Sequence, residues 1–205
     1  MAVDHLMALL ATLVREESTE HASAIFYTHA QASLVRGVIE NAARAVWLLG
    51  PDERLIRVQR RLALSVKEVK DSTKLHSRFD SQPARDEQTR LAEVRRLALA
   101  AGAPADTLKT FLTAPRYTRI VEEGGAHSEL SGQLILTLWS ACSSLAHGDI
   151  NGTFGLLGHE IVSQDDQTAL ARITGNCSML RYTTQAGIHL IDQALTLYTR
   201  RAVRP

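Results

Sequence analysis

The chain has 205 residues, of which 45% are hydrophobic and 22% are charged, a balance typical of a folded globular protein. Its net charge of +1 gives no general attraction to nucleic acid or to an anionic membrane, so any such contact must come from a local patch. No stretch reaches the roughly 18 apolar residues of a membrane span. We therefore expect a cytoplasmic protein that does not associate with membranes.

Helical periodicity dominates the first hundred residues. A first helix is expected over Val3–Glu16. Ser18 and Thr19, followed by Glu20 and His21, are typical caps for a second helix that ends at Leu49, before Gly50 and Pro51. The next two predicted helices cover Pro51–Phe79 and Ala84–Ala101.

The third of these helices has one apolar face and one basic face. The apolar residues recur three or four positions apart, as an amphipathic helix requires: Leu55, Val58, Leu62, Val66 and Val69. The other side carries Arg60, Lys67, Lys70, Lys74 and Arg78. A solvated surface explains this basic face, and RNA phosphates or an acidic partner are the alternative.

The second half of the chain is less regular. Short helical pieces are expected after Pro104 and Pro115, with a loop at 122–125. A strongly apolar helix follows over Ser128–His147, then a glycine-rich irregular segment near 148–160 with room for a short strand pair. A final helix is predicted over Asp165–Arg201. The sequence thus predicts an all-α, single-domain bundle (residues 1–205) of five to six main helices.

The second predicted helix carries a polar stripe opposite its apolar side. Its members are His29, Ser33, Arg36, Glu40, Arg44 and Trp47. Arg36, Glu40 and Arg44 are successive i, i+4 neighbours, so the glutamate can pair with either arginine. A solvated face is one interpretation. Trp47 favours the other, a pocket in which this stripe meets a second one, because a large aromatic seldom lies on a purely solvated line.

The 128–147 helix carries the second stripe, formed by Gln133, Ser140, Ser143, Ser144 and His147. The serines need partners if they are buried, although small residues also allow helices to pack closely. His147 precedes Gly148 at the helix end, where an imidazole either caps carbonyl groups or serves a function.

Cys142 and Cys177 both fall in apolar helical patterns, and we expect buried free thiols that suit a reducing cytosol.

His147, His159 and Asp149 lack the usual spacing of metal ligands. Gly148, Gly152, Gly155 and Gly158 match neither nucleotide-binding loop pattern. The sequence accordingly predicts neither a metal nor a cofactor.

Three segments carry a resemblance to known proteins. Glu40 to Pro51, Arg54 to Arg61 and Trp139 to Gly148 together resemble a group of actinobacterial helical proteins of unknown function, over roughly residues 33–157. More distantly, the chain resembles the HEPN superfamily (higher eukaryotes and prokaryotes nucleotide-binding). That resemblance implies a helical bundle that dimerises and, in many members, a metal-independent ribonuclease of toxin or defence systems.

HEPN nucleases carry an arginine, four to six further residues and then a histidine. Histidine suits acid and base catalysis near neutral pH, while arginine stabilises phosphate charge. In this chain His147 matches the histidine, but the arginine positions hold Ser140, Ala141 and Cys142. An arginine of the other stripe would have to take its place in space.

The site implied by the resemblance draws on both stripes. His147, Glu40 and Ser143 are the candidate catalytic residues, with Glu40 orienting the histidine. The candidate substrate-binding residues are Arg36, Arg44, Trp47, Ser140, Ser144 and Asp149. The expected partners are a second copy of the chain, RNA or a nucleotide, and a cognate protein.

Two alternatives remain at this point. One is a bundle that binds a small ligand or a protein without catalysis, and the other is a structural dimer seam formed by the stripes. A serine hydrolase built on Ser143 and His147 is disfavoured, because no Gly-x-Ser-x-Gly elbow is present.

Overall fold

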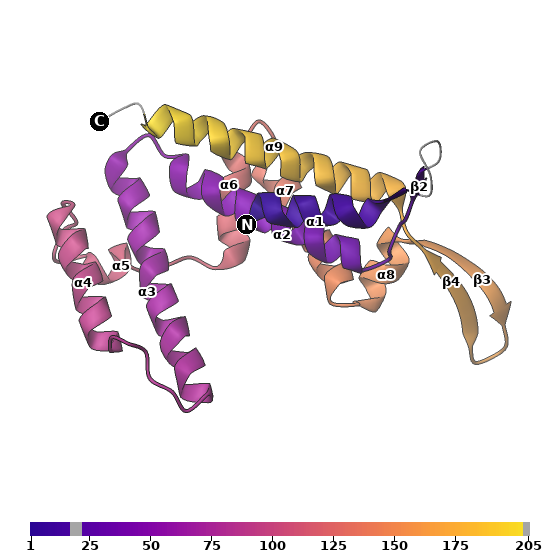
Figure 1. Ribbon diagram of the computed structural model, residues 1–205, viewed down its shortest axis with the longest axis horizontal. Coiled ribbons are helices and arrows are strands. Elements are labelled where there is room, and N and C mark those ends of the chain that lie inside the picture. Colours follow the sequence, from indigo (N-terminus) through magenta and orange to yellow (C-terminus); the bar gives the residue numbers. More distant parts are fainter. Residues whose placement is uncertain (17–21, 203–205) are drawn as a thin grey trace. The chain divides into compact units, whose positions relative to one another are not determined.

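The computed structural model describes residues 1–16 and 22–202, and most of them are helical (Figure 1). The predicted helical class is therefore confirmed. The chain divides into two compact units, formed by residues 1–47 with 118–205 and by residues 48–117. Among the helices of the described part, none combines the length and apolar character needed to cross a bilayer.

Unit 1, the first of these, contains most of the polar residues singled out above. Its helices are α1 (Ala2–Leu13), α2 (Ala30–Leu49), α6 (Tyr117–Ala126), α7 (Gly132–Ala146), α8 (Ile150–Leu156) and α9 (Cys177–Ala202), of which α2 and α6 reach the boundary with the second unit. Two short antiparallel hairpins accompany them, β1 (Val14–Glu16) with β2 (Ala22–Ala24) and β3 (Gly158–Gln164) with β4 (Ala169–Thr174).

Unit 2 is built on α3 (Arg54–Arg78), α4 (Glu87–Ala100) and the single turn α5 (Leu108–Phe111). Asp86 caps α4, because its carboxylate accepts the Thr89 backbone N–H at 2.9 Å. The predicted apolar face of α3 is confirmed in its centre, where Leu62 is buried in a cluster with residues of α4 and α5 and Val58 and Val66 pack against it.

Helix α2 lies at the centre of unit 1, and glycines bring other helices close to it. A Cβ at Gly124 would lie 2.3 Å from the Ala43 carbonyl oxygen, and one at Gly187 would lie 2.7 Å from the Val38 side chain. Only glycine permits such an approach of α6 and α9 to α2. The prediction of a loop over 122–125 was wrong, since these residues continue α6.

The first hairpin corrects the predicted ends of two helices. Helix α1 ends at Leu13, and the next residues form β1, in which Val14 pairs with Ala24 of β2. Helix α2 consequently begins only at Ala30. The capping prediction for Ser18 and Thr19, with Glu20 and His21, lies outside the described residues.

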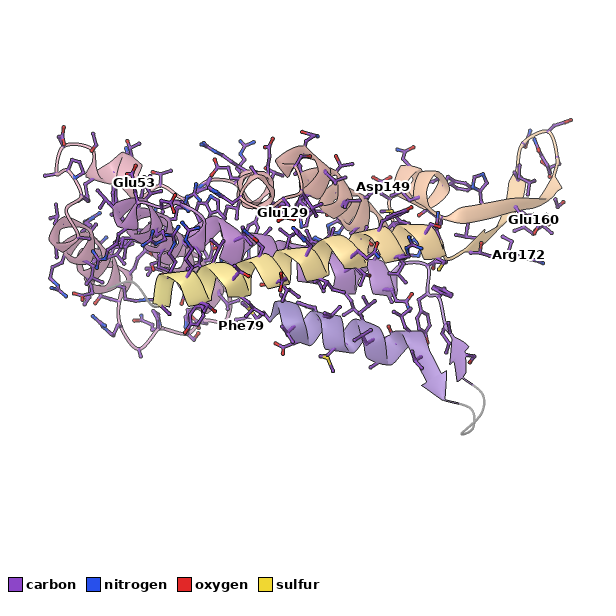
Figure 2. The ribbon with its side chains drawn as sticks, turned by 90° about the horizontal axis from the view of Figure 1, so that it is seen from above. Glu53, Phe79, Glu129, Asp149, Glu160 and Arg172 are labelled. Carbon is purple, nitrogen blue, oxygen red and sulfur yellow. The ribbon has the colours of Figure 1, made fainter. Side chains whose placement is uncertain are left out.

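The second hairpin replaces the start of the predicted final helix, and α8 replaces most of the predicted irregular segment. Residues 150–156 form α8, residues 158–174 form the hairpin, and α9 begins at Cys177 instead of Asp165. Figure 2 shows Glu160 and Arg172 on this hairpin, which extends away from the helices of unit 1. Its strands are almost wholly exposed.

Candidate functional site

Trp139 joins α7 to α2 through the first predicted stripe. Its indole Nε1–H donates to Glu40 Oε2 at 3.2 Å, and Arg36 pairs with the same carboxylate oxygen at 3.4 Å. The Arg36 guanidinium carbon lies 5.5 Å from the centroid of the Trp139 ring, within cation–π range. The three side chains therefore contact one another, although the Arg36 Nε is buried without a hydrogen-bond partner among the described residues, and this part of the stripe is a helix contact.

Trp47 forms a similar arrangement between α2 and α6. It is 2% exposed, and its indole N–H donates to Glu123 Oε2 at 2.8 Å. Arg119, four residues before Glu123 on α6, pairs with that carboxylate. Trp47 was expected at the open end of a stripe, but α6 covers that side of α2.

The predicted role of Glu40 as the group that orients His147 does not fit these contacts. Glu40 accepts from Trp139, and His147 lies eight residues further along the chain, just past the end of α7. At 1.5 Å per residue, Trp139 and His147 are about 12 Å apart along the helix axis. Arg44, one turn beyond Glu40, is half-buried on α2. The structure thus brings Arg36 and Glu40 together, but not with His147.

His147 ends α7 as the sequence predicted. Its backbone N–H donates to the Ser143 carbonyl at 3.1 Å, and the next two N–H groups, of Gly148 and Asp149, bond to the Leu145 and Ser144 carbonyls at 3.0 Å. Gly148 has φ +67°, the left-handed conformation that terminates helices. The imidazole of His147 is exposed, and within the described residues it makes no hydrogen bond.

An open depression of about 600 Å³ surrounds His147. Leu145, Ala146, Ile150 and Gly148 supply apolar lining, and the polar lining consists of His147, His29 and Thr153. The described residues that line the depression include no arginine or lysine, so the arginine of the nuclease motif has no equivalent here.

His29 is held rigidly at the edge of this depression. Its Nδ1 lies 2.9 Å from the Thr28 hydroxyl, and its Nε2 lies 3.2 Å from the Thr153 hydroxyl. The Thr153 hydroxyl itself donates to the Asp149 carbonyl at 2.9 Å, so it accepts from an N–H on Nε2. His29 therefore presents a fixed imidazole, whereas His147 presents an unengaged one.

Asp149 and the serines of α7 occupy structural positions around this site. The Asp149 carboxylate caps α8 by accepting the backbone N–H groups of Asn151 at 2.8 Å and Gly152 at 3.3 Å. A Cβ at Gly152 would lie 2.2 Å from the Ser144 hydroxyl, so Ser144 packs against α8. Ser143 is half-buried and Ser140 is exposed on α7.

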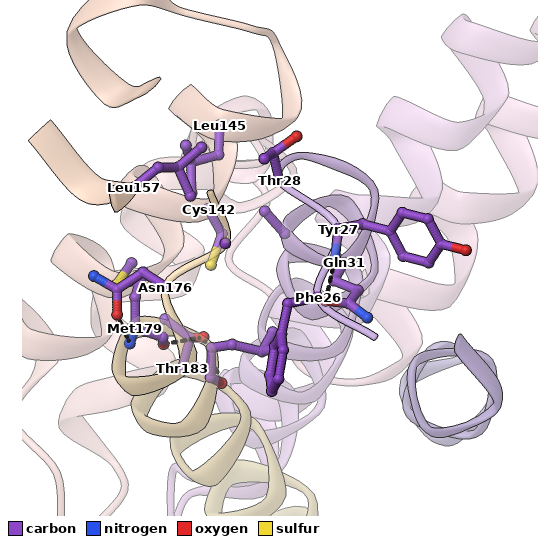
Figure 3. Close-up of a pocket in the computed structure, with 13 residues that line it drawn as sticks. Phe26, Tyr27, Thr28, Gln31, Cys142, Leu145, Leu157, Asn176, Met179 and Thr183 are labelled. Atoms are coloured by element: carbon purple, nitrogen blue, oxygen red, sulfur yellow. Dashed lines mark hydrogen bonds between the residues drawn. The ribbon is translucent and has the colours of Figure 1, made fainter. Parts of the chain in front are cut away.

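A small cavity lies on the other side of α7, between α7, α9 and the segment before α2 (Figure 3). Its volume of about 30 Å³ has room for one or two water molecules but not for an organic ligand. Gln31 and Thr183 line it and are the buried polar residues of the described core. Gln31 donates to the Ile25 carbonyl at 2.8 Å, which holds this segment in place.

Cys142 also lines this cavity and is not a nucleophile at neutral pH. Burial raises the pKa of its thiol from 9.0 to about 11, against an opposing hydrogen bond with Thr183. Cys177, at the start of α9, is exposed. The prediction of two buried thiols was therefore right for Cys142 and wrong for Cys177.

No cluster of three or more His, Cys, Asp or Glu side chains able to hold a metal ion occurs within residues 1–16 and 22–202. Comparison with protein-family models, curated proteins and solved structures found no match to this chain. The candidate site is thus defined by its own geometry, around His147 and His29.

His29 and Thr153 were absent from the site that the sequence predicted. His29 is a member of the first polar stripe. That membership is the only sequence signal that points to it. Its approach to α8 depends on where α2 begins and on the turn at Gly148, and neither contact is visible in a helical wheel. Thr153 carries no signal beyond its position in the glycine-rich segment.

Proposed function

We propose that this chain is a HEPN-like protein that binds RNA or a nucleotide at the depression around His147, without cleaving it. The observation that carries the proposal is the presence of two imidazoles, His147 and His29, on one open depression with an apolar floor. Histidine rings stack on unpaired bases, and the unengaged imidazole of His147 can also donate a hydrogen bond to a ribose or phosphate oxygen. The floor formed by Leu145 and Ile150 is suited to the face of a base.

The same geometry supports binding over catalysis. Cleavage next to a 2′-hydroxyl needs a base, an acid and a group that stabilises charge on phosphate. Both ring nitrogens of His29 are engaged with threonine hydroxyls, and no guanidinium lines the depression. Arg36, one of the two arginines of the first stripe, lies on Trp139 and pairs with Glu40.

Fluorescence anisotropy with a labelled single-stranded RNA of ten nucleotides at low salt tests the proposal. We expect His147→Ala to weaken binding at least tenfold and the RNA to stay intact on a denaturing gel. Because His147 is exposed, the variant should keep its unfolding free energy within about 0.5 kcal/mol. His76→Ala, which changes a histidine of unit 2, is the matched control and should bind like the wild type.

Equal affinity of the wild type and His147→Ala, or no binding by the wild type, would contradict the proposal. RNA that is cleaved by the wild type and left intact by His147→Ala would support the nuclease alternative instead.

The expected homodimer remains a prediction, and α1 is the surface in unit 1 that fits it best. The helix is apolar on its outward side as well as on its buried side, with Val3, Met7 and Leu10 all at least 47% exposed. A helix that is hydrophobic all round is normally covered by other protein. The polar stripe on α2 is a poorer dimer seam, since its Glu40 and Arg36 are already in contact with Trp139.

A further inference from the structure

Unit 2 contains a pocket that the function proposed above does not use. It has a volume of about 480 Å³ and lies between α3, α4 and α5. Its apolar lining comes from Val66, Leu91, Leu108 and Leu112. Its charged lining consists of three cations, Lys70, Arg95 and Lys109, with no acidic residue among the lining side chains.

The helical repeat explains why cations surround an apolar floor. Lys70 follows Val66 by one turn on α3, and Arg95 follows Leu91 by one turn on α4. Residues four apart share a helix face. Lys70 and Arg95 therefore each lie beside the apolar lining residue of the preceding turn. Long cationic side chains commonly keep the apolar stem on such a surface and the charge in water.

Several other cations on the same helices are neutralised by acidic neighbours. Lys67 pairs with Asp71, Arg61 with Glu68 and Arg96 with Glu93. Within the described residues, Lys70, Arg95 and Lys109 make no ion pair. Three like charges at one opening repel one another, and an anion placed between them would remove that repulsion.

We propose that this pocket binds a small amphiphilic anion, an aliphatic chain that ends in a phosphate or carboxylate. The leucine and valine floor would take the chain, and the three cations would take the head group. The lining contains no aromatic ring to stack on a base and only one neutral polar side chain, Thr113, so it is a poor nucleotide site. The volume suits a small molecule.

Isothermal titration calorimetry of the full chain with octyl phosphate, below its micelle concentration and at low salt, tests the proposal. We expect saturable binding at one site. Inorganic phosphate, which lacks the chain, and octyl glucoside, which lacks the charge, should each bind at least tenfold more weakly. Binding of octyl phosphate should also weaken in 0.5 M NaCl, because the head-group interaction is screened.

Charge variants assign the site. Arg95→Gln and Lys109→Gln should each weaken octyl phosphate binding by about 5- to 10-fold, because each removes one cation from the opening. Lys67→Gln is the matched control, since Lys67 is on α3 but pairs with Asp71, and it should leave the affinity unchanged. All three residues are exposed, so their melting curves should match that of the wild type.

Equal binding of octyl glucoside and octyl phosphate would overturn the proposal, as would charge variants that bind octyl phosphate like the wild type. His147→Ala should retain full octyl phosphate binding. A failure at this pocket is therefore distinguishable from a failure of RNA binding at the depression of unit 1.

Discussion

Trp139 and His147 lie eight residues apart on the same helix, one within α7 and one at its end. Around Trp139 the polar groups contact one another, because its indole donates to Glu40 and its ring lies under Arg36. Around His147 the imidazole is exposed beside an open depression. A single helix thus carries one structural contact and one candidate binding group.

The comparison also explains why the stripes do not form one site. Glu40 and Arg36 are two of the three charged residues of the first stripe, and both contact Trp139. The candidate site is left with imidazoles, hydroxyls and an apolar floor. Such a set can recognise a base and a ribose, but it lacks the fixed cation that phosphoryl chemistry usually requires.

The largest expected effect is on the stability that the Trp139 contact contributes within α7. Trp139→Ala should lower the free energy of unfolding by about 3–5 kcal/mol, because it removes a large buried ring and leaves Glu40 without its donor. Trp139→Phe keeps most of the ring but removes the N–H, and should cost about 1–3 kcal/mol. Urea denaturation followed by circular dichroism measures both.

Leu134→Ala is the control on the same helix. Leu134 is 43% exposed, so its truncation should cost less than about 1 kcal/mol. If Trp139→Ala lowered the free energy of unfolding no more than Leu134→Ala does, Trp139 would not be the structural contact assigned to it.

A smaller effect is expected at Cys142, on the buried side of α7. Its folded pKa of about 11 exceeds the ordinary value of 9.0, so the native state holds the proton more tightly. Its contribution to stability is fully present below about pH 9 and is lost as the pH rises towards 11. The unfolding free energy of the wild type relative to Cys142→Ala should fall across that window.

Alkylation provides a second readout for the two thiols. Iodoacetamide at pH 8 should modify the exposed Cys177 in the native protein and leave Cys142 unmodified, as judged by mass spectrometry of the peptides. Equal labelling of Cys142 and Cys177 would show that the face of α7 that carries Cys142 is not buried.

The elements with regular periodicity were predictable from the sequence. The α3 helix follows from its apolar spacing. The end of α7 follows from Gly148, the glycine after the cap residue His147. The depression around His147 was predictable only in part. His147 was identified as its centre, but the contacts of His29 and Thr153 depend on how α8 folds back on α7.

The β3–β4 hairpin was missed because its turn uses the chemistry of a helix cap. Asp165 resembles an N-cap, and its carboxylate does accept the backbone N–H groups of Gln167 at 2.9 Å and Thr168 at 2.7 Å. An aspartate makes the same bonds in a tight turn as at a helix start. The signal was therefore real, but the residues after it pair with β3 instead of continuing a helix.

The loop predicted over 122–125 failed for a different reason. Adjacent glycines usually interrupt a helix, yet Gly124 lies where α6 crosses the Ala43 carbonyl of α2. Close packing there outweighs the low helix propensity of glycine. A helix crossing joins residues about eighty positions apart, and single-sequence periodicity carries no information about it.

The most direct test of the account is NMR of the histidine side chains during a titration with the ten-nucleotide RNA. We predict that the ring resonances of His29 and His147 shift together and saturate, while those of His76 in unit 2 do not move. RNA that binds and leaves both His29 and His147 unperturbed would contradict the assignment of the depression as the binding site.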